Sequence, residues 1–387
     1  MSRPTTTTEA SALHLSWEED GVARTARWRS ESGQPAPRRV IVADDQLAAD
    51  AAYRLACEGC AMLWRGDYHN ARQLLQAMAR RIARRPRKAK QDKGAAPAPA
   101  DAFHLHRQAQ AQRARILGML LIPFDADFGI PLRRAPDARA ACAQAWQADG
   151  EPSVASLREL LGLIGAWEWH RKGVEVPALG DRIHPCYGVF SPVRGEYVDL
   201  VAKAPLPSPA LAFDIGTGSG VLAAVLARRG VARVVATDQD ERALACAADN
   251  LARLGLSAHV DLVRTDLFPD GRAPLLVCNP PWLPARPTSP VEHAVYDPES
   301  RMLRGFLSGL AGHLAPGGEG WLILSDLAEH LGLRSRAELL EWIGAAGLRV
   351  VDRLDARPRH PRAQDATDPL HAARSAEVTS LWRLAAS

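Results

Sequence analysis

A glycine-rich turn between two apolar segments constrains the possible folds of this chain more than any other feature. Residues 211–215 predict a buried strand, and residues 221–227 predict an apolar helix. Gly216, Gly218 and Gly220 stand between them, and glycine lets a backbone adopt positive φ and approach a ligand closely. The segment therefore predicts a strand, a ligand-binding turn and a helix, although a tight connection without a ligand would use the same residues.

The residues around this turn narrow the kind of ligand. Val221 stands where the dinucleotide fingerprint G-x-G-x-x-G requires its last glycine, so the turn does not follow that pattern. Asp214 precedes the first glycine by two residues, and its carboxylate would repel a pyrophosphate. The turn is therefore better suited to a cationic ligand.

The next two predicted strands also end in an acidic residue. Residues 231–238 end at Asp238 and residues 259–266 end at Asp266, with an amphipathic helix predicted over 241–254 between them. Asp238 lies about 20 residues after the glycines, the spacing at which a carboxylate meets ribose hydroxyls in α/β folds. Each acid alone is more often a cap or turn residue. Acids at three successive strand ends favour a ligand site, because ligands in open α/β sheets bind there.

A fourth apolar run, residues 275–278, leads into the sequence Asn279-Pro280-Pro281-Trp282. Asn279 offers a side-chain carbonyl acceptor, and Pro280 forces it into an extended conformation. The two prolines stiffen the loop and remove two backbone donors, so the carbonyls here need donors from elsewhere. Trp282 supplies a flat face for an amide or a nucleobase. The corner could hold a planar amino group while its nitrogen attacks an electrophile, or it could be a rigid loop with a core tryptophan.

Together these motifs resemble the class I S-adenosylmethionine-dependent methyltransferases that methylate amino nitrogens. Within that class the chain is similar to the HemK/PrmC-type glutamine N5-methyltransferases and to the small-domain rRNA guanine N2-methyltransferases. The resemblance covers residues 183–387 and implies an α/β fold with a doubly wound, mostly parallel seven-stranded sheet of Rossmann-like type. In one departure, HemK-type enzymes usually carry Tyr where this chain has Trp282, whose wider ring suits a larger planar target.

The resemblance also implies a role for each residue of the motifs. The cofactor would be S-adenosyl-L-methionine, with its methionine part at the glycine turn and Asp214, its ribose at Asp238 and its adenine at Asp266. Asn279 and the carbonyl of Pro280 would accept the hydrogen bonds of the acceptor –NH2. The implied cofactor-binding residues are Asp214, Gly216, Thr217, Gly218, Gly220, Asp238, Asp266, Leu267 and Asn279. The implied catalytic residues are Asn279, Pro280, Pro281 and Trp282.

The predicted function is therefore an enzyme that transfers a methyl group from S-adenosylmethionine to a planar amino group. The acceptor is expected to be a protein glutamine side chain (N5) or the exocyclic amine of an RNA base, and no metal is expected. The alternative is a non-catalytic RNA- or protein-binding module that retains the methyltransferase fold. The intact Asn279-Pro280-Pro281 argues against that alternative.

The remainder of the C-terminal half completes the predicted sheet. Strands are expected over 318–325, 348–354 and 377–384, with a helix over 336–346. The loop between the last two strands is polar and rich in Arg and His. A loop of that length is usually functional or disordered, so it could contact an acidic partner or remain solvated.

The sequence predicts two domains. Residues 1–180 are expected to form a mainly helical substrate-recognition domain with a basic linker at about 86–100, and residues 181–387 the methyltransferase domain. Within the first domain, a strand is expected over 38–44, and helices are expected over 50–85, 102–121 and 153–172.

A run of basic residues precedes and enters this linker. Its members are Arg80, Arg81, Arg84, Arg85, Arg87, Lys88, Lys90 and Lys93, opposed within the run only by Asp92. Such a run can bind phosphates with an affinity that falls steeply as salt rises, or it can be a solvated helix end. Beside an amino-methylating domain, it suggests an RNA partner or a protein associated with the ribosome or with translation factors.

Composition limits the remaining possibilities. The 387 residues are 47% hydrophobic, but no apolar run reaches ~18 residues, so no membrane span is predicted. Residues 1–10 lack the apolar region of a secretory signal. The pair Cys57 and Cys60, within a helical pattern and without a second pair at zinc spacing, is interpreted as two buried thiols. A cytoplasmic location is expected.

Overall fold

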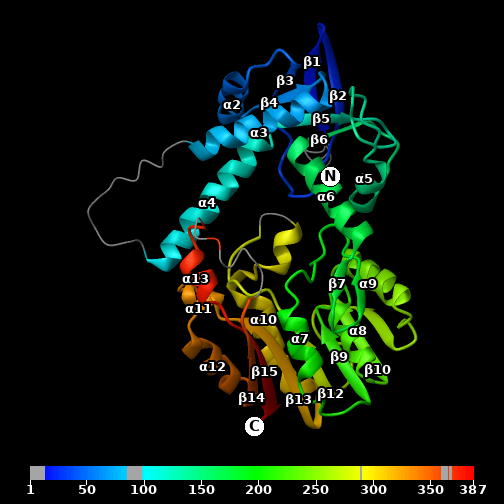
Figure 1. Ribbon diagram of the computed structural model, residues 1–387, viewed down its shortest axis with the longest axis vertical. Coiled ribbons are helices and arrows are strands. Elements are labelled where there is room, and N and C mark those ends of the chain that lie inside the picture. The colour runs from blue at the N-terminus through cyan, green and yellow to red at the C-terminus, as the bar shows by residue number, and fades with distance from the viewer. Residues whose placement is uncertain (1–13, 85–97, 288–289, 359–364, 366–367) are drawn as a thin grey trace, which may run out of the picture. The chain divides into compact units, whose positions relative to one another are not determined.

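The computed structural model describes residues 14–84, 98–287, 290–358, 365 and 368–387 (Figure 1). The chain divides into two compact units, of which the first comprises residues 1–96 and 105–168 and the second residues 97–104 and 169–387. The proposed boundary at residues 180/181 falls between two short strands of the second unit, β7 (Val174–Val176) and β8 (Asp181–Ile183). The predictions for residues 1–10, and for the basic run and linker from residue 85 to residue 97, lie outside the described residues.

The second unit is built on a seven-stranded sheet with the order β11-β10-β9-β12-β13-β15-β14 (Figure 1). Its strands are β9 (Leu211–Ile215), β10 (Arg233–Asp238), β11 (Val260–Arg264), β12 (Ala273–Cys278), β13 (Leu314–Ser325), β14 (Leu348–Ala356) and β15 (Thr379–Ala386). Neighbouring strands are parallel except that β15 runs antiparallel to both β13 and β14. The predicted doubly wound, mostly parallel, seven-stranded sheet is confirmed.

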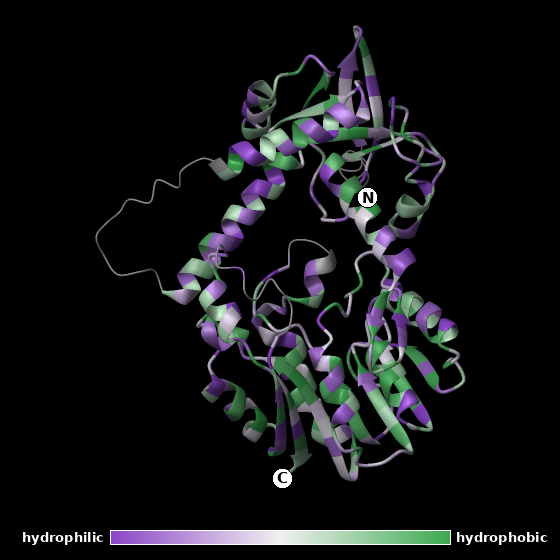
Figure 2. Cartoon of the chain, in the orientation of Figure 1, coloured by the Kyte–Doolittle hydropathy of each residue, from purple (hydrophilic) through white to green (hydrophobic). Residues whose placement is uncertain are grey.

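Helices cover both faces of this sheet because its central strands are apolar on both faces (Figure 2). Successive residues of a strand point to opposite faces, so Ala212 packs in one core and Phe213 in the other. The helices on the Ala212 face are α7 (Glu196–Lys203), α8 (Val221–Arg228) and α9 (Glu241–Arg253). The helices on the Phe213 face are α10 (Arg301–His313) and α12 (Arg336–Ala345).

Short elements complete the second unit at the edge where the parallel strands end. They are η1 (Pro290–Ala294), η2 (Pro298–Ser300), α11 (Leu327–His330) and α13 (His371–Ala376). Ala328 of α11 and Leu331, directly after it, pack with Leu283 and Leu370 in a separate apolar cluster. This cluster supports the chain that follows β12, where the Asn-Pro-Pro-Trp sequence lies.

The first unit contains a six-stranded mixed sheet with the order β1-β2-β6-β5-β4-β3 (Figure 1). Its strands are β1 (His14–Glu19), β2 (Val22–Trp28), β3 (Arg39–Ala43), β4 (Cys60–Trp64), β5 (Leu120–Phe124) and β6 (Ser153–Ser156). Its helices are α2 (Ala49–Cys57), α3 (Tyr68–Arg84), α5 (Arg139–Ala145), α6 (Leu157–Lys172) and α4 (Pro99–Leu117), the last of which begins in the second unit.

The prediction of a mainly helical N-terminal domain was wrong, because the helices of this unit are organised around a sheet. Two of the three predicted helices include a whole strand, β4 and β6, and the third runs into the start of β5. Residues 60–64 and 120–124 are buried at every position. A short, fully buried strand shows no alternation of polar and apolar residues, so it continues the apolar pattern of an adjacent helix.

The interpretation of Cys57 and Cys60 as two buried thiols also needs correction. Cys57 is the last residue of α2 and is exposed, whereas Cys60 is buried as the first residue of β4. Gly59 turns the chain between them at a φ of 78°. Within the described residues, no group of three or more His, Cys, Asp or Glu side chains is arranged to hold a metal ion. Over the same residues, no helix is both long and apolar enough to cross a membrane.

Candidate active site

Four side chains singled out from the sequence lie at the carboxyl ends of four neighbouring parallel strands. Asp214 is the next-to-last residue of β9, and Asp238 is the last residue of β10. Asp266 lies just after β11, and Asn279 follows β12 directly. Because these strands are adjacent and parallel, their ends meet at one edge of the sheet, the usual ligand edge of an open α/β sheet.

Asp214 is buried and organises the glycine turn. Its Oδ2 accepts hydrogen bonds from Thr217 Oγ1 at 2.7 Å and from the backbone N–H of Ala223 at 3.0 Å. Only 1% of the residue is exposed, and this burial raises the pKa of its carboxyl group to about 6, against the effect of the two hydrogen bonds. The carboxylate therefore ties the turn to the first turn of α8 and places a negative charge beneath it.

The three glycines of the turn all have left-handed backbone conformations. The φ angles are 72° for Gly216, 55° for Gly218 and 79° for Gly220, a region that residues with a Cβ rarely adopt. A Cβ at Gly220 would also lie 3.1 Å from Cβ of Ala247 in α9. The sequence therefore needs glycine here both for conformation and for the close approach of α9.

Asp238 joins the same turn to the end of β10. Its Oδ2 accepts a hydrogen bond from the backbone N–H of Gly218, and its Oδ1 accepts one from the N–H of Asp240, each at 3.0 Å. Burial raises the pKa of this carboxyl group, although the hydrogen bonds lower it. The two acids at the ends of β9 and β10 thus hold opposite sides of one loop.

Asp266 and Leu267 form the third side of the site. Asp266 is about half-exposed and forms an ion pair with Arg301 at the start of α10. Leu267 has a positive φ of 75°, and its carbonyl accepts a hydrogen bond from Thr237 Oγ1 at 2.6 Å. These bonds fix the backbone that follows β11 against the end of β10.

Two glycines of α10, which the sequence reasoning missed, make room for this segment. A Cβ at Gly305 would overlap the side chain of Leu267, and a Cβ at Gly309 would overlap the ring of Phe268. Phe268 stacks on His313 with its ring centroid 4.3 Å away and the two planes 8° apart. The spacing of four between the glycines places them on one helix face and was the available signal.

The Asn-Pro-Pro-Trp corner is internally hydrogen-bonded. The indole Nε1–H of Trp282 donates to Oδ1 of Asn279 at 2.9 Å. Trp282 is half-buried and packs against the cores on both faces of the sheet. The guanidinium of Arg194 lies over its ring, 5.3 Å from the centroid. Trp282 is therefore a fixed part of the corner with one face covered.

Arg194 was missed by the sequence reasoning, and it is the centre of a buried charge cluster. Its Nε donates to Glu196 at 2.9 Å, and a terminal nitrogen donates to Glu377 at 3.0 Å. The two glutamates are 4% and 3% exposed, and Ser325 Oγ also donates to Glu377 at 2.7 Å. Arg194 and Glu377 are 183 positions apart, so no local pattern could have paired them.

The segment before α7 packs against that helix through the ring of Phe190. The rings of Phe190 and Tyr197 lie 6.2 Å apart, and Tyr197 is buried. The start of this segment, at His184, is connected to the glycine turn through Asn250 of α9. The Asn250 side chain forms hydrogen bonds with the backbone of His184 and with the carbonyl oxygen of Ser219. The segment is thus held next to the candidate site.

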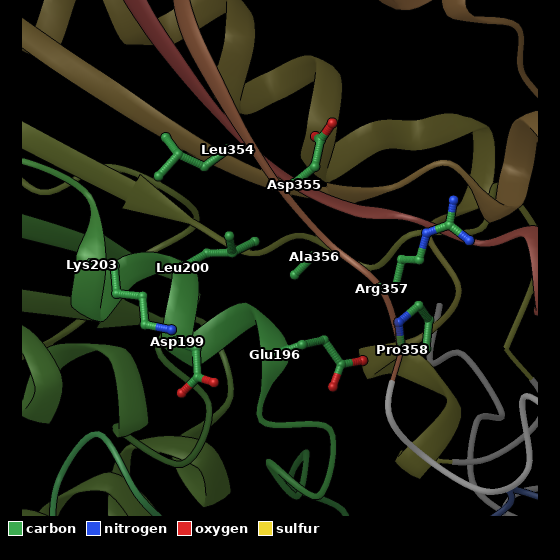
Figure 3. A pocket seen from close by; sticks show the side chains of 9 residues that line it. All are labelled: Glu196, Asp199, Leu200, Lys203, Leu354, Asp355, Ala356, Arg357 and Pro358. Carbon is green, nitrogen blue, oxygen red and sulfur yellow. The ribbon is translucent and has the colours of Figure 1, made fainter.

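A pocket of about 460 Å³ lies beside the charge cluster, between α7 and the end of β14 (Figure 3). Its lining residues are Glu196, Asp199, Leu200, Lys203, Leu354, Asp355, Ala356, Arg357 and Pro358. Acidic and basic side chains both face it, and none of the residues singled out as a site from the sequence lines it. Glu196 both lines this pocket and accepts a hydrogen bond from Arg194, so it connects the pocket to the charge cluster.

Comparison with known proteins gives similarities that centre on this part of the chain. Residues 204–280 match the protein family described as "Ribosomal protein L11 methyltransferase (PrmA)". The chain is 34% identical over 186 residues to a release factor glutamine methyltransferase of Cereibacter sphaeroides, which covers 43% of this chain and 63% of that protein. It is 38% identical over 144 residues to a ribosomal protein L11 methyltransferase of Pelotomaculum thermopropionicum, covering 36% of this chain and 39% of that protein.

A third relative is a release factor glutamine methyltransferase of Mycobacterium tuberculosis, 35% identical over 160 residues and covering 35% of this chain and 51% of that protein. The chain therefore spans between 39% and 63% of the length of these three relatives. The family match includes the glycine turn and reaches Pro280. With the strand order of the sheet, these similarities identify the fold of the second unit as that of the class I methyltransferases.

Proposed function

We propose that this protein transfers a methyl group from S-adenosylmethionine to the side-chain nitrogen of a glutamine in a protein. The observation that carries the proposal is the position of Asn279 and Pro280 at the end of β12, directly beside the glycine turn of β9. This position puts acceptors for a planar amino group next to a turn suited to a cationic ligand. The similarity to proteins named glutamine methyltransferases and ribosomal protein methyltransferases supports a protein acceptor.

The cofactor would bind across the carboxyl ends of β9, β10 and β11. In this proposal the glycine turn, with Thr217 and the charge of Asp214 beneath it, receives the cationic methionine part. Asp238 accepts the ribose hydroxyls, and the segment Asp266–Leu267 contacts the adenine. The buried carboxylate of Asp214 supports this arrangement, because a fixed negative charge in a low-dielectric site favours a sulfonium and an ammonium.

Orientation is the main contribution that this site can make to the reaction. An amide nitrogen is a poor nucleophile because its lone pair is delocalised into the carbonyl. Asn279 Oδ1 has two lone pairs, of which the Trp282 N–H takes one, so the second is available to one N–H of the acceptor. The carbonyl of Pro280 would take the other N–H. Holding both bonds aims the lone pair at the methyl group, and correct orientation can supply roughly 7–11 kcal/mol.

The reaction balances without another reactant. The acceptor nitrogen forms a bond to the methyl carbon while the carbon–sulfur bond breaks, which leaves S-adenosylhomocysteine and a positively charged nitrogen. That nitrogen then loses its proton to water. The groups of the site bind and orient, and none of them needs to be a strong base before the transfer.

Labelled methyl transfer into a bacterial extract tests the proposal. The protein is incubated with S-adenosyl-[methyl-³H]methionine and extract, and the label is measured after digestion with either ribonuclease or protease. We expect label that survives ribonuclease and disappears with protease, and that is absent with the Asn279→Ala variant. Calorimetry should show that this variant still binds S-adenosylmethionine. Label in RNA would mean that the acceptor is the amine of an RNA base and not a glutamine. No label in either fraction would favour a binding module without catalysis.

The acceptor would be a protein of the translation machinery, and the reaction would take place in the cytoplasm. Candidates are a peptide-chain release factor and ribosomal protein L11, because the relatives are named for them. The first unit, with the basic end of α3, is the proposed recognition domain. Arg80 and Arg81 of the basic run lie on α3, and Arg81 pairs there with Asp50.

A further inference from the structure

A continuous series of contacts leads from two buried carboxylates to the proposed acceptor-binding oxygen. Glu196, at the start of α7, and Glu377, just before β15, both accept hydrogen bonds from Arg194. The guanidinium of Arg194 covers one face of Trp282. The indole N–H of Trp282 in turn donates to Oδ1 of Asn279. The contacts of Arg194 with Glu377 and with Trp282 join residues that are far apart in the sequence.

The last contact decides which atom of the Asn279 amide faces the indole of Trp282. The indole nitrogen of Trp282 can only donate a hydrogen bond. An amide turned by 180° would place its NH2 group against that N–H, so two donors would face each other. Trp282 therefore holds the asparagine with its oxygen towards the indole, and the position of that oxygen follows the position of the ring.

The contacts of Arg194 with the two glutamates and with Trp282 decide where the indole ring of Trp282 can lie. Trp282 is in a loop after β12, and it is only half-buried, so packing alone leaves it room to move. A planar guanidinium stacks on an indole better than a lysine ammonium does, and two carboxylates fix the plane of this one. Both glutamates are almost inaccessible to solvent, so the cluster is screened little by salt.

We propose that Arg194 is a positioning residue for the methyl acceptor: clamped by Glu196 and Glu377, it holds Trp282, and Trp282 holds the Asn279 amide in its accepting orientation. This inference rests on the proposed function for the role of Asn279. It also narrows the way in which the acceptor is recognised. Because Arg194 covers one face of Trp282, a planar acceptor can stack only on the other face, and hydrogen bonds to oxygen carry the recognition.

The clamp can be tested without knowing the acceptor, through the ¹⁵N-labelled indole N–H signals of the ten tryptophans. The Trp282 signal is assigned by its loss in Trp282→Phe. We expect Arg194→Lys to shift or broaden this signal and to accelerate its exchange with water. A matched control is Arg304→Lys, because Arg304 lies over a different tryptophan, Trp342, at the same 5.3 Å and should leave the Trp282 signal unchanged. An unchanged Trp282 signal in folded Arg194→Lys overturns the proposal.

Kinetics with a purified bacterial release factor as acceptor tests the consequence of the clamp. Arg194→Lys should lower kcat by about ten- to a hundredfold, because a misplaced reactant loses that much, while the Kd for S-adenosylmethionine changes less than about twofold. In the Trp282→Phe background, which has no indole N–H, Arg194→Lys should cause little further loss. Independent, multiplying losses in the double variant would contradict action through Trp282.

A second variant protects the test against misfolding. Glu377→Gln keeps the shape of its side chain but weakens the clamp, so it should give a smaller change of the same kind in the Trp282 signal and in kcat. Circular dichroism reports whether each variant is folded. If the unaltered protein methylates neither a release factor nor ribosomal protein L11, the proposed function fails, while the indole signals still decide whether the clamp exists.

Discussion

Replacing the buried carboxyl group of Asp214 by an amide should stabilise the protein at neutral pH and weaken cofactor binding. In Asp214→Asn, one oxygen remains to accept the bonds from Thr217 and Ala223, so the turn keeps its shape. What disappears is a negative charge in a site with almost no exposure. The effect on stability and the effect on binding should therefore have opposite signs.

The size of the stability effect follows from the pKa of Asp214. Burial raises it from 3.8 to about 6, roughly two units, and one unit is about 1.4 kcal/mol. Because the folded pKa is the higher one, the folded state binds the proton more tightly than the unfolded state. The favourable contribution is complete below about pH 4 and is lost as pH rises through about 6. At pH 7.5 the variant should gain at most about 3 kcal/mol over the unaltered protein.

Urea unfolding of both proteins between pH 4 and pH 8 measures this difference. The gain of the variant should be near zero at the acid end, grow through the window set by the two pKa values, and stay constant above it. A gain that is independent of pH, or a loss that grows with pH, would refute the burial argument. Calorimetry should show weaker binding of S-adenosylmethionine, and a smaller loss for S-adenosylhomocysteine, which lacks the sulfonium charge.

Three further substitutions test other parts of the account. Asp238→Ala should weaken binding of S-adenosylmethionine by about tenfold or more in calorimetry, because it removes the acceptor proposed for the ribose and the bond to the glycine turn. Gly309→Ala should also weaken that binding, since its Cβ would displace Phe268 and with it the backbone of Leu267; Gly312→Ala, where the added Cβ meets open space, is the control. Arg383→Met should lower the free energy of unfolding by about 2–3 kcal/mol in urea, because it leaves Glu319 partly buried without the guanidinium that binds both its oxygens. An Arg383→Met protein as stable as the original would show that this ion pair contributes nothing.

The sheet of the second unit was predictable because its signals are local. Strand, turn and helix follow one another from Leu211 to Arg228, and an acid stands at the end of β10 and just after the end of β11. Parallel strands then bring these ends to one edge without any further information. The same reasoning failed for β4 and β5, whose five buried residues each carry no alternation.

The parts of the site that the sequence did not reveal depend on contacts between distant residues. Trp282 was interpreted as a flat surface for the acceptor, but its indole N–H also donates a hydrogen bond to Asn279. Although these two residues are only three apart, the bond forms only when the loop is folded. Arg194 and Glu377 are in contact only because the segment before α7 and the segment before β15 lie at the same edge of the sheet. A pattern of residue types cannot encode such a meeting.

The most direct test of the central claim is to locate the methyl group on a purified acceptor. The unaltered protein and Asn279→Ala are each incubated with S-adenosylmethionine and either a bacterial release factor or ribosomal protein L11, and tandem mass spectrometry of the digested acceptor finds the modified residue. We predict one added methyl group on a glutamine side-chain nitrogen with the unaltered protein, and none with Asn279→Ala although that variant still binds the cofactor. Equal methylation by both proteins would contradict the claim that Asn279 holds the accepting nitrogen.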